Sequence, residues 1–362
     1  MPETVATGAA VRTLEEQELP TRERQRQTAG RFPLVPVVLA LAAALLAACC
    51  ASLLIGTESV APARLLTAVL DGRDADAEAW SLVVDYRLPR TLVAVAVGAA
   101  LGVAGAVIQA YTRNPLADPG ILGVNAGAAL AVIVAIWFGV ASSTAALVWP
   151  ALVGAAIATL LVLLLAAAGR GPATPVRMVL AGVAMAAVFG GITTGIRLSD
   201  ERTFERFRSW AAGSVAGRDL TDLAAVIPVI IVGLIVGILL VKPLNAVALG
   251  DDVAAALGVS VATVRLATVA SVALLAGAAT AVAGPIGFVG LMIPHTVRLL
   301  VGNDQTRIIP LSVLAAPTLL LVADTLARVV VPLREVPVGI VTALIGGPVL
   351  IALIRNKAVD TQ

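Results

Sequence analysis

The chain has 362 residues, of which 59% are hydrophobic and 13% are charged, and its mean hydropathy is +0.99. Because a soluble domain carries about 25% charged residues, this composition predicts an integral membrane protein. The formal net charge of +2 does not indicate nucleic acid as a partner, and the adjacent cysteines Cys49 and Cys50 indicate neither a disulfide framework nor a metal cluster.

The first 32 residues are polar and charged, and they precede the first apolar run without an A-x-A-like cleavage site after it. We therefore expect a disordered cytoplasmic tail over residues 1–32 and a retained first span rather than a cleaved signal peptide. Four arginines just before the span favour a cytoplasmic N-terminus, namely Arg22, Arg24, Arg26 and Arg31.

Ten apolar runs follow along the chain, and about 20 apolar residues are needed to cross a bilayer of about 30 Å. The short alternating segments of a membrane β-barrel do not occur. The sequence therefore predicts an all-α transmembrane domain over residues 33–357, with both termini in the cytoplasm. The ten predicted spans lie at 33–55, 91–110, 121–140, 146–168, 178–196, 223–241, 266–283, 285–301, 310–327 and 336–354.

A polar insert, "RNPLADPGILGVNAGA" at residues 113–128, separates the second and third runs. On the predicted topology it is a cytoplasmic turn, in which proline and asparagine reverse the chain direction. Gly123 and Gly127 would let the third span pack closely on a neighbouring helix.

The longest predicted outside segments are 56–90 and 197–222, and the longest inside loop is 242–265. In this loop, "LGDDVAAALGVSVATVRL" predicts two short helices, of which the first begins at Gly250 and ends at Gly258. Ser260 would cap the second helix.

The first of these short helices would expose an apolar face, Val253 and Leu257, between acidic caps, which suits a groove on a partner protein. A helix pair folded back on its own bundle is the alternative.

Two segments echo each other: "GAALGVAGAVI" at 98–108 and "GAATAVAGPIG" at 277–287 share GAA-x-x-VAG. The first lies in the second predicted span and the second in the seventh, so the two helices would run in opposite directions. This indicates an inverted repeat of spans 2–5 and 7–10, as in transporters built from two halves. The alternative is a chance match between two helices rich in alanine and glycine.

Catalytic motifs are missing from the sequence. Neither Lys242 nor Lys357 stands in the GK[ST] context of a phosphate-binding loop, so the chain cannot supply one. The single histidine, His295, and the two cysteines cannot build a metal or nucleophilic centre. We expect no catalytic residue, no metal and no cofactor, and we interpret His295, beside Arg298, as a capping or loop-contact histidine.

Ionisable residues inside apolar runs are candidates for function, because their burial is costly. Asp324 and Arg328 are four residues apart and can pair on one helix face, either as a proton or ion relay or as a structural ion pair, which we favour. Arg87 and Arg90, in "RLPR", lie at the outer mouth of the second span, and Arg328 lies at the outer end of the ninth. These three arginines could receive carboxylates of a docking protein or an anionic solute.

Several stretches together resemble the FecCD family of ABC-importer permeases, which serve iron-siderophore, heme and cobalamin uptake. The resemblance runs from about residue 35 to 357, and "TRNPLADPGILGVNAGA" is most similar to ferric-enterobactin-type permeases. The stretches are "RLPRTLVAVAVGAALGVAGAVIQAYTRNPLADPGILGVNAGA", "GPIGFVGLMIPHTVRLLVG", "VADTLARVVVP" and "VPVGIVTALIGGPVLIALIR".

The resemblance implies a bacterial cell-membrane permease with ten spans, which moves a ferric siderophore and has no catalytic activity of its own. Its implied partners are a second permease subunit, paralogous or identical, two cytoplasmic ATP-binding subunits and an extracytoplasmic solute-binding protein. It assigns binding-protein docking to Arg87, Arg90 and Arg328, and a translocation path to the fifth span, with Thr193 and Thr194. It assigns ATPase coupling to the segment that holds Gly250, Asp251, Asp252, Val253, Leu257 and Gly258, which lacks the full EAA-type pattern.

A secondary transporter, driven by an ion gradient through Asp324, is the alternative function. It predicts more buried acids and more polar helix breaks at mid-membrane than this sequence contains.

Overall fold

The computed structural model describes residues 32–56, 60–140, 143, 145–168, 174–331 and 335–359, and within these ranges every regular element is helical. The predicted tail lies outside the described residues except for Phe32. The first elements are α2 (Leu34–Leu54), α3 (Pro62–Asp71), α4 (Ala77–Trp80), the π-helix η1 (Ser81–Arg87), α5 (Leu88–Thr112), the 3₁₀ turn η2 (Pro119–Leu122), α6 (Val124–Trp137), the 3₁₀ turn η3 (Ala145–Leu147) and α7 (Val148–Ala167).

The second half continues in the same way from one helix to the next. Its elements are α8 (Pro175–Ser199), α9 (Glu201–Ala211), α10 (Leu220–Leu239), α11 (Val241–Ala248), α12 (Asp251–Ala256), α13 (Val261–Ala283), α14 (Val289–Val301), α15 (Gln305–Val329) and α16 (Val338–Val359).

Each of the ten predicted apolar runs coincides with a helix. In the described ranges, seven helices are long and apolar enough to cross a membrane, and three shorter apolar helices cover Val124–Trp137, Val289–Val301 and Val338–Ile351. The all-helical membrane architecture is thus as predicted, whereas the count of ten transmembrane spans stays a prediction. The same holds for the inverted repeat of spans 2–5 and 7–10. Its two sequence echoes begin in α5 and in α13, helices that pack against each other.

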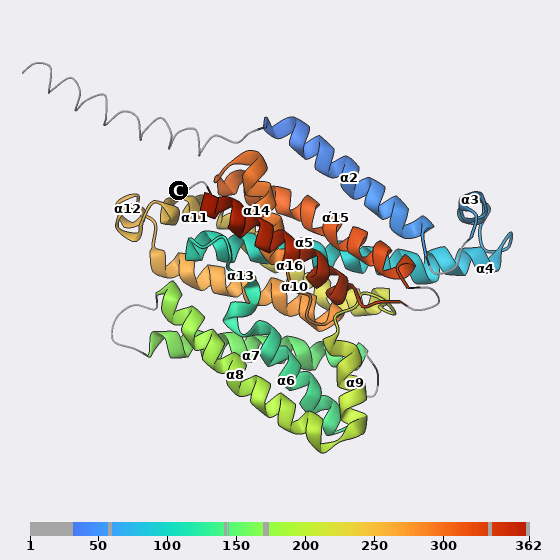
Figure 1. Ribbon diagram of the computed structural model, residues 1–362, viewed down its shortest axis with the longest axis horizontal. Helices are drawn as coiled ribbons and strands as arrows, with labels where there is room; N and C mark the ends of the chain where they lie inside the picture. The colour runs from blue at the N-terminus through green and yellow to red at the C-terminus, as the bar shows by residue number, and fades with distance from the viewer. Residues whose placement is uncertain are drawn as a thin grey trace, which may run out of the picture.

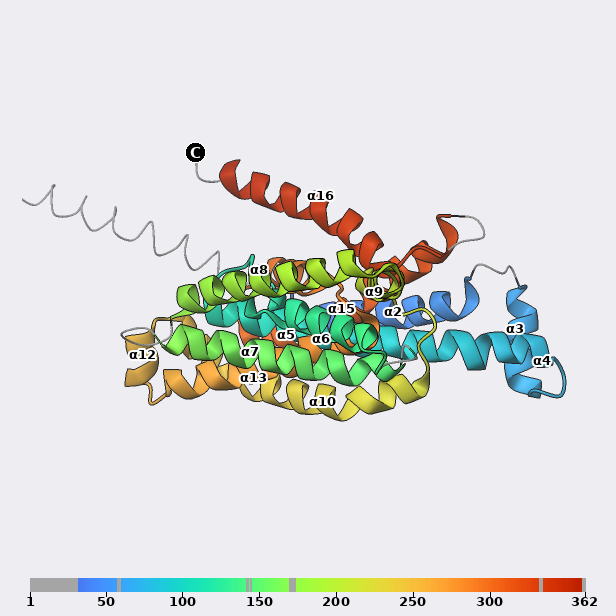
Figure 2. The same ribbon diagram turned by 90° about the horizontal axis from the view of Figure 1, so that it is seen from below.

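The centre of the molecule is α5, which lies among α10, α13, α14 and α15 (Figure 1). In its most apolar stretch 83% of the residues are buried, against 17% in α2 and in α8, which lie at the periphery. Figure 1 also shows that α3 and α4 lie at one end of the bundle and α11 and α12 at the opposite end. Figure 2 shows α16 slanting away from the other helices.

Small residues allow these helices to approach closely. A Cβ atom at Gly105 of α5 would lie 1.8 Å from the carbonyl oxygen of Gly290 in α14. A Cβ atom at Gly127 of α6 would lie 2.4 Å from the carbonyl oxygen of Gly154 in α7. Backbone contact of this kind is the usual way in which membrane helices pack without a hydrophobic driving force. It confirms the close packing expected for Gly127.

The loop after α10 differs in one respect from the sequence prediction. The first short helix is present as α12, bounded by Gly250 and Gly258, both with positive φ. Ser260 does cap the next helix, since its hydroxyl accepts from the Thr263 amide, but that helix is the 23-residue α13 and not a short one. The prediction of two short helices was wrong because the apolar pattern beginning at Val261 continues without a break into the span.

Candidate functional site

A buried ion cluster joins α5 and α15 at the end of the bundle that carries α3 and α4. Asp324 accepts hydrogen bonds from Arg90 Nε at 2.9 Å and Arg90 Nη2 at 2.8 Å, and from Arg328 Nε at 3.1 Å. Arg328 Nη2 forms a further ion pair with the same carboxylate. The exposed fractions are 1% for Asp324, 3% for Arg328 and 9% for Arg90. The expected pairing of Asp324 with Arg328 is confirmed, and Arg90 joins it.

The close packing of α5 on α15 brings these residues together. Gly98 faces Pro317, while Gly102, further along α5, faces Ala316, earlier in α15, so the two helices run antiparallel. Arg90 precedes Gly98 by eight residues and Asp324 follows Pro317 by seven. At about 1.5 Å per residue both steps cover roughly 10 to 12 Å in the same direction. The two side chains therefore meet at one level.

The end of α2 completes the cluster. Arg328 Nη1 donates to the carbonyl oxygen of Ser52 at 2.7 Å, and Arg87 Nη1 donates to those of Leu53 at 2.8 Å and Leu54 at 2.9 Å. The last carbonyls of a helix lack partners within it and carry partial negative charge, so two guanidinium groups here stabilise both the helix end and themselves. The Ser52 hydroxyl lies 2.8 Å from that of Thr91.

The exposed part of the cluster is its rim at Glu335. Arg90 Nη1 donates to Glu335 at 2.7 Å, and the Glu335 side chain is 35% exposed. A cavity of about 230 Å³ is lined by all three predicted docking arginines together with Tyr86, Glu335 and Gly217. The structure thus places Arg87, Arg90 and Arg328 around one cavity, but most of their donors face partners inside the chain. Sequence reasoning did not identify Glu335 or Ser52 as part of this site. For Glu335 a signal was available, because it is the sole acidic residue between Asp324 and Asp360.

The other end of α5 carries a different contact. Arg113 ends the helix with a positive φ of 52°, donates from Nε to the carbonyl oxygen of Val247 in α11 at 2.9 Å, and forms an ion pair with Asp251 of α12. The side chains of Arg113 and Asp251 are 43% and 61% exposed. The start of the 113–128 insert is therefore attached to the predicted coupling segment.

Side chains within the insert fix its shape. The side-chain oxygen of Asn114 accepts a hydrogen bond from the Leu116 amide at 3.0 Å, and the Asp118 carboxylate accepts one from the Gly120 amide at 2.8 Å. Asn125 accepts from the Thr280 hydroxyl at 2.9 Å, which links the insert to α13. Such short polar side chains stabilise tight turns by replacing backbone hydrogen bonds.

The predicted coupling segment presents an apolar surface. Val253 and Leu257 are exposed, whereas Ala254 is buried against the bundle. Asp251 and Asp252 lie in the first turn of α12, where negative charge is favoured by the helix dipole. The sequence left open whether this helix contacts a partner protein or folds back on its own bundle. Both interpretations keep some support, because one side of α12 packs on the chain and the other is exposed.

The two threonines of the predicted path point to different surroundings. Thr193 is buried, with a hydroxyl that has no hydrogen-bond partner in the described part of the chain. Thr194 lines a cavity of about 310 Å³ with Arg197, Glu201 and Phe204. Of these two threonines, Thr194 is the one that lines a cavity.

His295 is buried in α14, near a polar contact that the sequence analysis missed. Gln109 of α5 donates to the carbonyl oxygens of Gly290 at 3.2 Å and Leu291 at 3.0 Å, and Arg298 lies 3.5 Å from its side-chain oxygen. The sequence signal for this contact was Gln109 itself, a glutamine near the end of an apolar run. Among the described residues no group of three or more His, Cys, Asp or Glu side chains could hold a metal ion.

Comparison with known proteins gives matches along most of the chain. The sequence model of the FecCD transport family matches residues 44–356. The ferric enterobactin transport system permease protein FepD of Escherichia coli (strain K12) is 46% identical over 325 residues, 89% of this chain and 95% of that protein. The hemin transport system permease protein HmuU of Yersinia pestis is 38% identical over 283 residues, 77% of this chain and 84% of that protein.

A solved structure shows the same fold. It is described as an inward-facing conformation of a metal-chelate type ABC transporter, and it superposes with a TM-score of 0.77 at 28% sequence identity. The match covers 89% of this chain and 99% of the other.

Proposed function

The chain belongs to the FecCD transport family, and from this membership we propose that it is the permease subunit of an ABC importer that carries a ferric siderophore into a bacterial cell. The observation that carries the proposal is the 46% identity to a ferric enterobactin permease over 95% of that protein's length. The helical fold with its seven long apolar helices supports a place in the cell membrane. The family's role in transport agrees with a subunit that carries out no covalent chemistry.

The proposed assembly contains a second permease subunit, two cytoplasmic ATP-binding subunits and an extracytoplasmic solute-binding protein. The proposed orientation puts the cluster of Arg90, Asp324 and Arg328 on the outside and α12 on the inside. In this orientation the N- and C-termini are cytoplasmic.

On the outside, the rim of the ion cluster is the proposed docking point. Arg90 Nη1 and its exposed partner Glu335 are the parts that a carboxylate of the binding protein can reach. An incoming carboxylate would replace Glu335 on Arg90, while the bonds to Asp324 hold the guanidinium in position. Charges at such a rim mainly raise the association rate and fix the register of docking.

On the inside, α12 is the proposed contact with the ATP-binding subunits. Its exposed Val253 and Leu257 would occupy an apolar groove, and Asp251 would pass displacement of α12 to Arg113 at the end of α5. Because α5 reaches from this contact to the ion cluster, movement at one face is transmitted along a single helix.

The geometry does not favour the ion-gradient alternative. The carboxylate of Asp324 is engaged by the guanidinium groups of Arg90 and Arg328 and is 1% exposed. A carboxylate in this setting acts as the centre of a structural ion cluster, because a proton carrier needs a path to water.

The test is uptake of ferric enterobactin, labelled with radioactive iron, into an iron-starved deletion strain that carries the chain on a plasmid. We expect uptake that depends on the chain and is abolished when the partner ATPase is inactivated. Uptake that continues without ATP hydrolysis and collapses with the ion gradient would contradict the proposal. Failure of every ferric siderophore in a panel would contradict the substrate class.

A further inference from the structure

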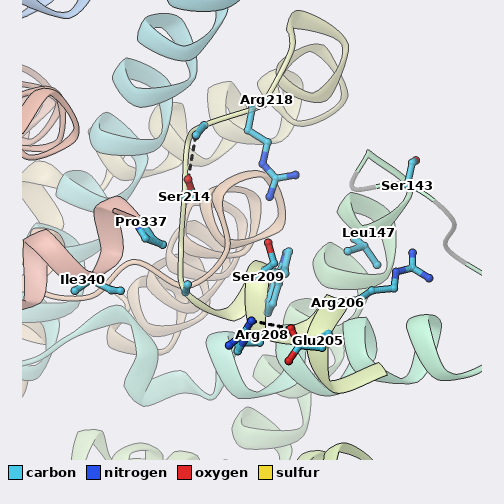
Figure 3. A pocket seen from close by; sticks show the side chains of 13 residues that line it. Ser143, Leu147, Glu205, Arg206, Arg208, Ser209, Ser214, Arg218, Pro337 and Ile340 are labelled. Carbon is cyan, nitrogen blue, oxygen red and sulfur yellow. Dashed lines mark hydrogen bonds and ion pairs between the residues drawn. The ribbon is translucent and has the colours of Figure 1, made fainter. Parts of the chain in front are cut away.

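A second, larger cavity lies beside α9, separated from the ion cluster by the loop at residues 212–218. We call it the α9 cavity; its volume is about 850 Å³. Its walls come from α9, from this loop, from Leu147 and from the first turn of α16 with Pro337 and Ile340 (Figure 3). Ala216 lines both this cavity and the cavity at the ion cluster, so the two cavities adjoin at this loop.

The charges that line the α9 cavity are mostly positive. Arg206, Arg208 and Arg218 are opposed within the lining only by Glu205. Glu205 is bound to Arg208 at 2.7 Å, and with three arginines and one glutamate the lining keeps an excess of positive charge. A cavity with this excess charge attracts anions.

Arg218 is the decisive residue. It is 7% exposed, and its Nε and Nη1 have no hydrogen-bond partner in the described part of the chain. Figure 3 shows its guanidinium directed from the loop toward α9, above Ser209. Burial lowers the pKa of Arg218 from its ordinary value, and the charge of Asp222 opposes this shift only in part.

A second donor in the wall is also unused. Trp210 is 3% exposed and lines the cavity, and its indole Nε1 has no partner among the described residues. Leaving a buried donor unpaired costs about 1 to 3 kcal/mol, and more when it is charged, so folded proteins seldom keep such groups without a reason. Both groups can only donate, so their missing partner is an acceptor.

The size of the cavity indicates the kind of acceptor. Sites for small molecules enclose about 300 to 1,000 Å³, and they combine apolar walls with a few directed polar groups. A volume of about 850 Å³ falls in this range and exceeds the space that one carboxylate side chain fills. Trp210, Leu147 and Ile340 supply the apolar part of the wall.

We propose that the α9 cavity is a binding site for a negatively charged iron chelate, whose anionic oxygens are received by Arg218. The inference rests on the proposed function, and it adds that this permease itself selects for negative charge on the chelate. The chelate would pass from the binding protein, docked at the ion cluster, across the 212–218 loop into the cavity.

The test uses the complete transporter, permease with its partners, in lipid nanodiscs, and two iron chelates of different charge. The probes are ferric enterobactin, an anionic catecholate chelate, and ferrichrome, an uncharged hydroxamate chelate. For Arg218→Gln we expect ferric enterobactin to bind at least about tenfold more weakly, the loss of one hydrogen bond to a charged group. The affinity for ferrichrome should be the same in this variant as in the wild type, whatever its value in the wild type.

Two further variants keep the result interpretable. Arg218→Lys keeps the charge and should restore part of the binding, and Arg202→Gln, on α9 but outside the cavity lining, is the matched control and should bind as the wild type does. Because Arg218 Nε and Nη1 are buried without a hydrogen-bond partner among the described residues, Arg218→Gln should raise Tm or leave it unchanged. If the variant fails to fold, Trp210→Phe, which removes the indole donor, is measured in its place and should also weaken the binding of ferric enterobactin.

Equal binding of ferric enterobactin to the wild type and to folded Arg218→Gln or Trp210→Phe would overturn the inference. The inference would also be overturned if a variant still binds the chelate but no longer captures the unloaded binding protein. In that case the cavity receives a carboxylate of the binding protein and not a chelate. These outcomes differ from failure of the proposed function, in which the wild-type transporter itself neither binds nor imports any iron chelate.

Discussion

The two ends of α5 carry arginine–aspartate pairs of opposite character. Arg90 meets an Asp324 that is 1% exposed and shared with a second arginine, whereas Arg113 meets an Asp251 whose side chain is 61% exposed. Removing one partner of a buried pair leaves a charge without compensation, but an exposed pair contributes little and reforms easily. One end is therefore built to stay fixed and the other can change partners, as expected of a helix that links a docking face to a coupling face.

The largest effect should come from the fixed end. Asp324→Ala leaves the guanidinium groups of Arg90 and Arg328 buried without their carboxylate, and we expect a loss of about 3 to 5 kcal/mol of unfolding free energy. The measurement is SDS-induced unfolding in mixed micelles. Asp252→Ala, in the first turn of α12, is the control and should change little. A loss below 1 kcal/mol for Asp324→Ala would mean that α2 and α15 hold together without the cluster.

Packing at the middle of α5 comes next. A Cβ at Gly105 would lie 1.8 Å from the Gly290 carbonyl oxygen, so Gly105→Ala must push α14 away and should cost about 1 to 3 kcal/mol in the same assay. Gly190→Ala on α8, where a Cβ meets nothing within 4 Å, is the matched control and should be neutral or stabilising. Equal stability of both variants would show that α5 and α14 separate freely.

At the rim of the fixed end, removing a charge should strengthen an interaction instead of weakening one. Glu335→Gln weakens the competitor for Arg90 Nη1, so we expect capture of the binding protein to become severalfold tighter, while Arg90→Gln weakens it. The measurement is the Kd between the binding protein and the permease complex in nanodiscs, at low and at high salt. If Glu335→Gln also weakens capture, Glu335 contacts the binding protein itself and the exchange at Arg90 is wrong.

The adjustable end should show a small effect on stability and a larger one on coupling. Arg113→Ala removes an exposed ion pair, which is worth about 0.2 to 1 kcal/mol, yet it detaches α12 from α5. We expect uptake per ATP hydrolysed to fall severalfold while unfolding changes little. Asp251→Ala should give the same phenotype, and the double variant should add nothing further. Additive losses would place the two residues on separate routes.

The smallest effect should come from the exposed tip beyond the fixed end, where α3 and α4 meet. Arg64 binds Asp76 and Glu78, and its hydrogen bonds lower the pKa of Asp76 below the ordinary value. A lowered pKa in the folded state adds stability above the unfolded value of about 3.9, and this is lost as the pH falls through the folded pKa. Hydrogen exchange in α3 should therefore accelerate only under acid conditions.

Arg64→Ala should remove this pH dependence, and Arg73→Ala, another exposed arginine of the tip, should preserve it. Exchange in α3 that speeds up equally at neutral pH in both variants would show that the contact does not hold the tip.

The sequence by itself determined the helices, because apolar runs of membrane length leave the backbone no other way to satisfy its hydrogen bonds. It also determined the pairing of Asp324 with Arg328, since a spacing of four fixes their common face, and the bounds of α12 by Gly250 and Gly258. Local signals of this kind need no knowledge of neighbouring helices.

Only the tertiary structure decided which helix meets which. The spacing of residues does not say that Arg90 reaches Asp324, that the end of α2 receives Arg87 and Arg328, or that Arg113 reaches α12. These contacts join residues far apart in the chain and depend on backbone approach at Gly98, Gly102 and Gly105. The α9 cavity arises in the same way, because the buried donors of Arg218 that lack a partner among the described residues can be recognised only once the surrounding helices have been placed.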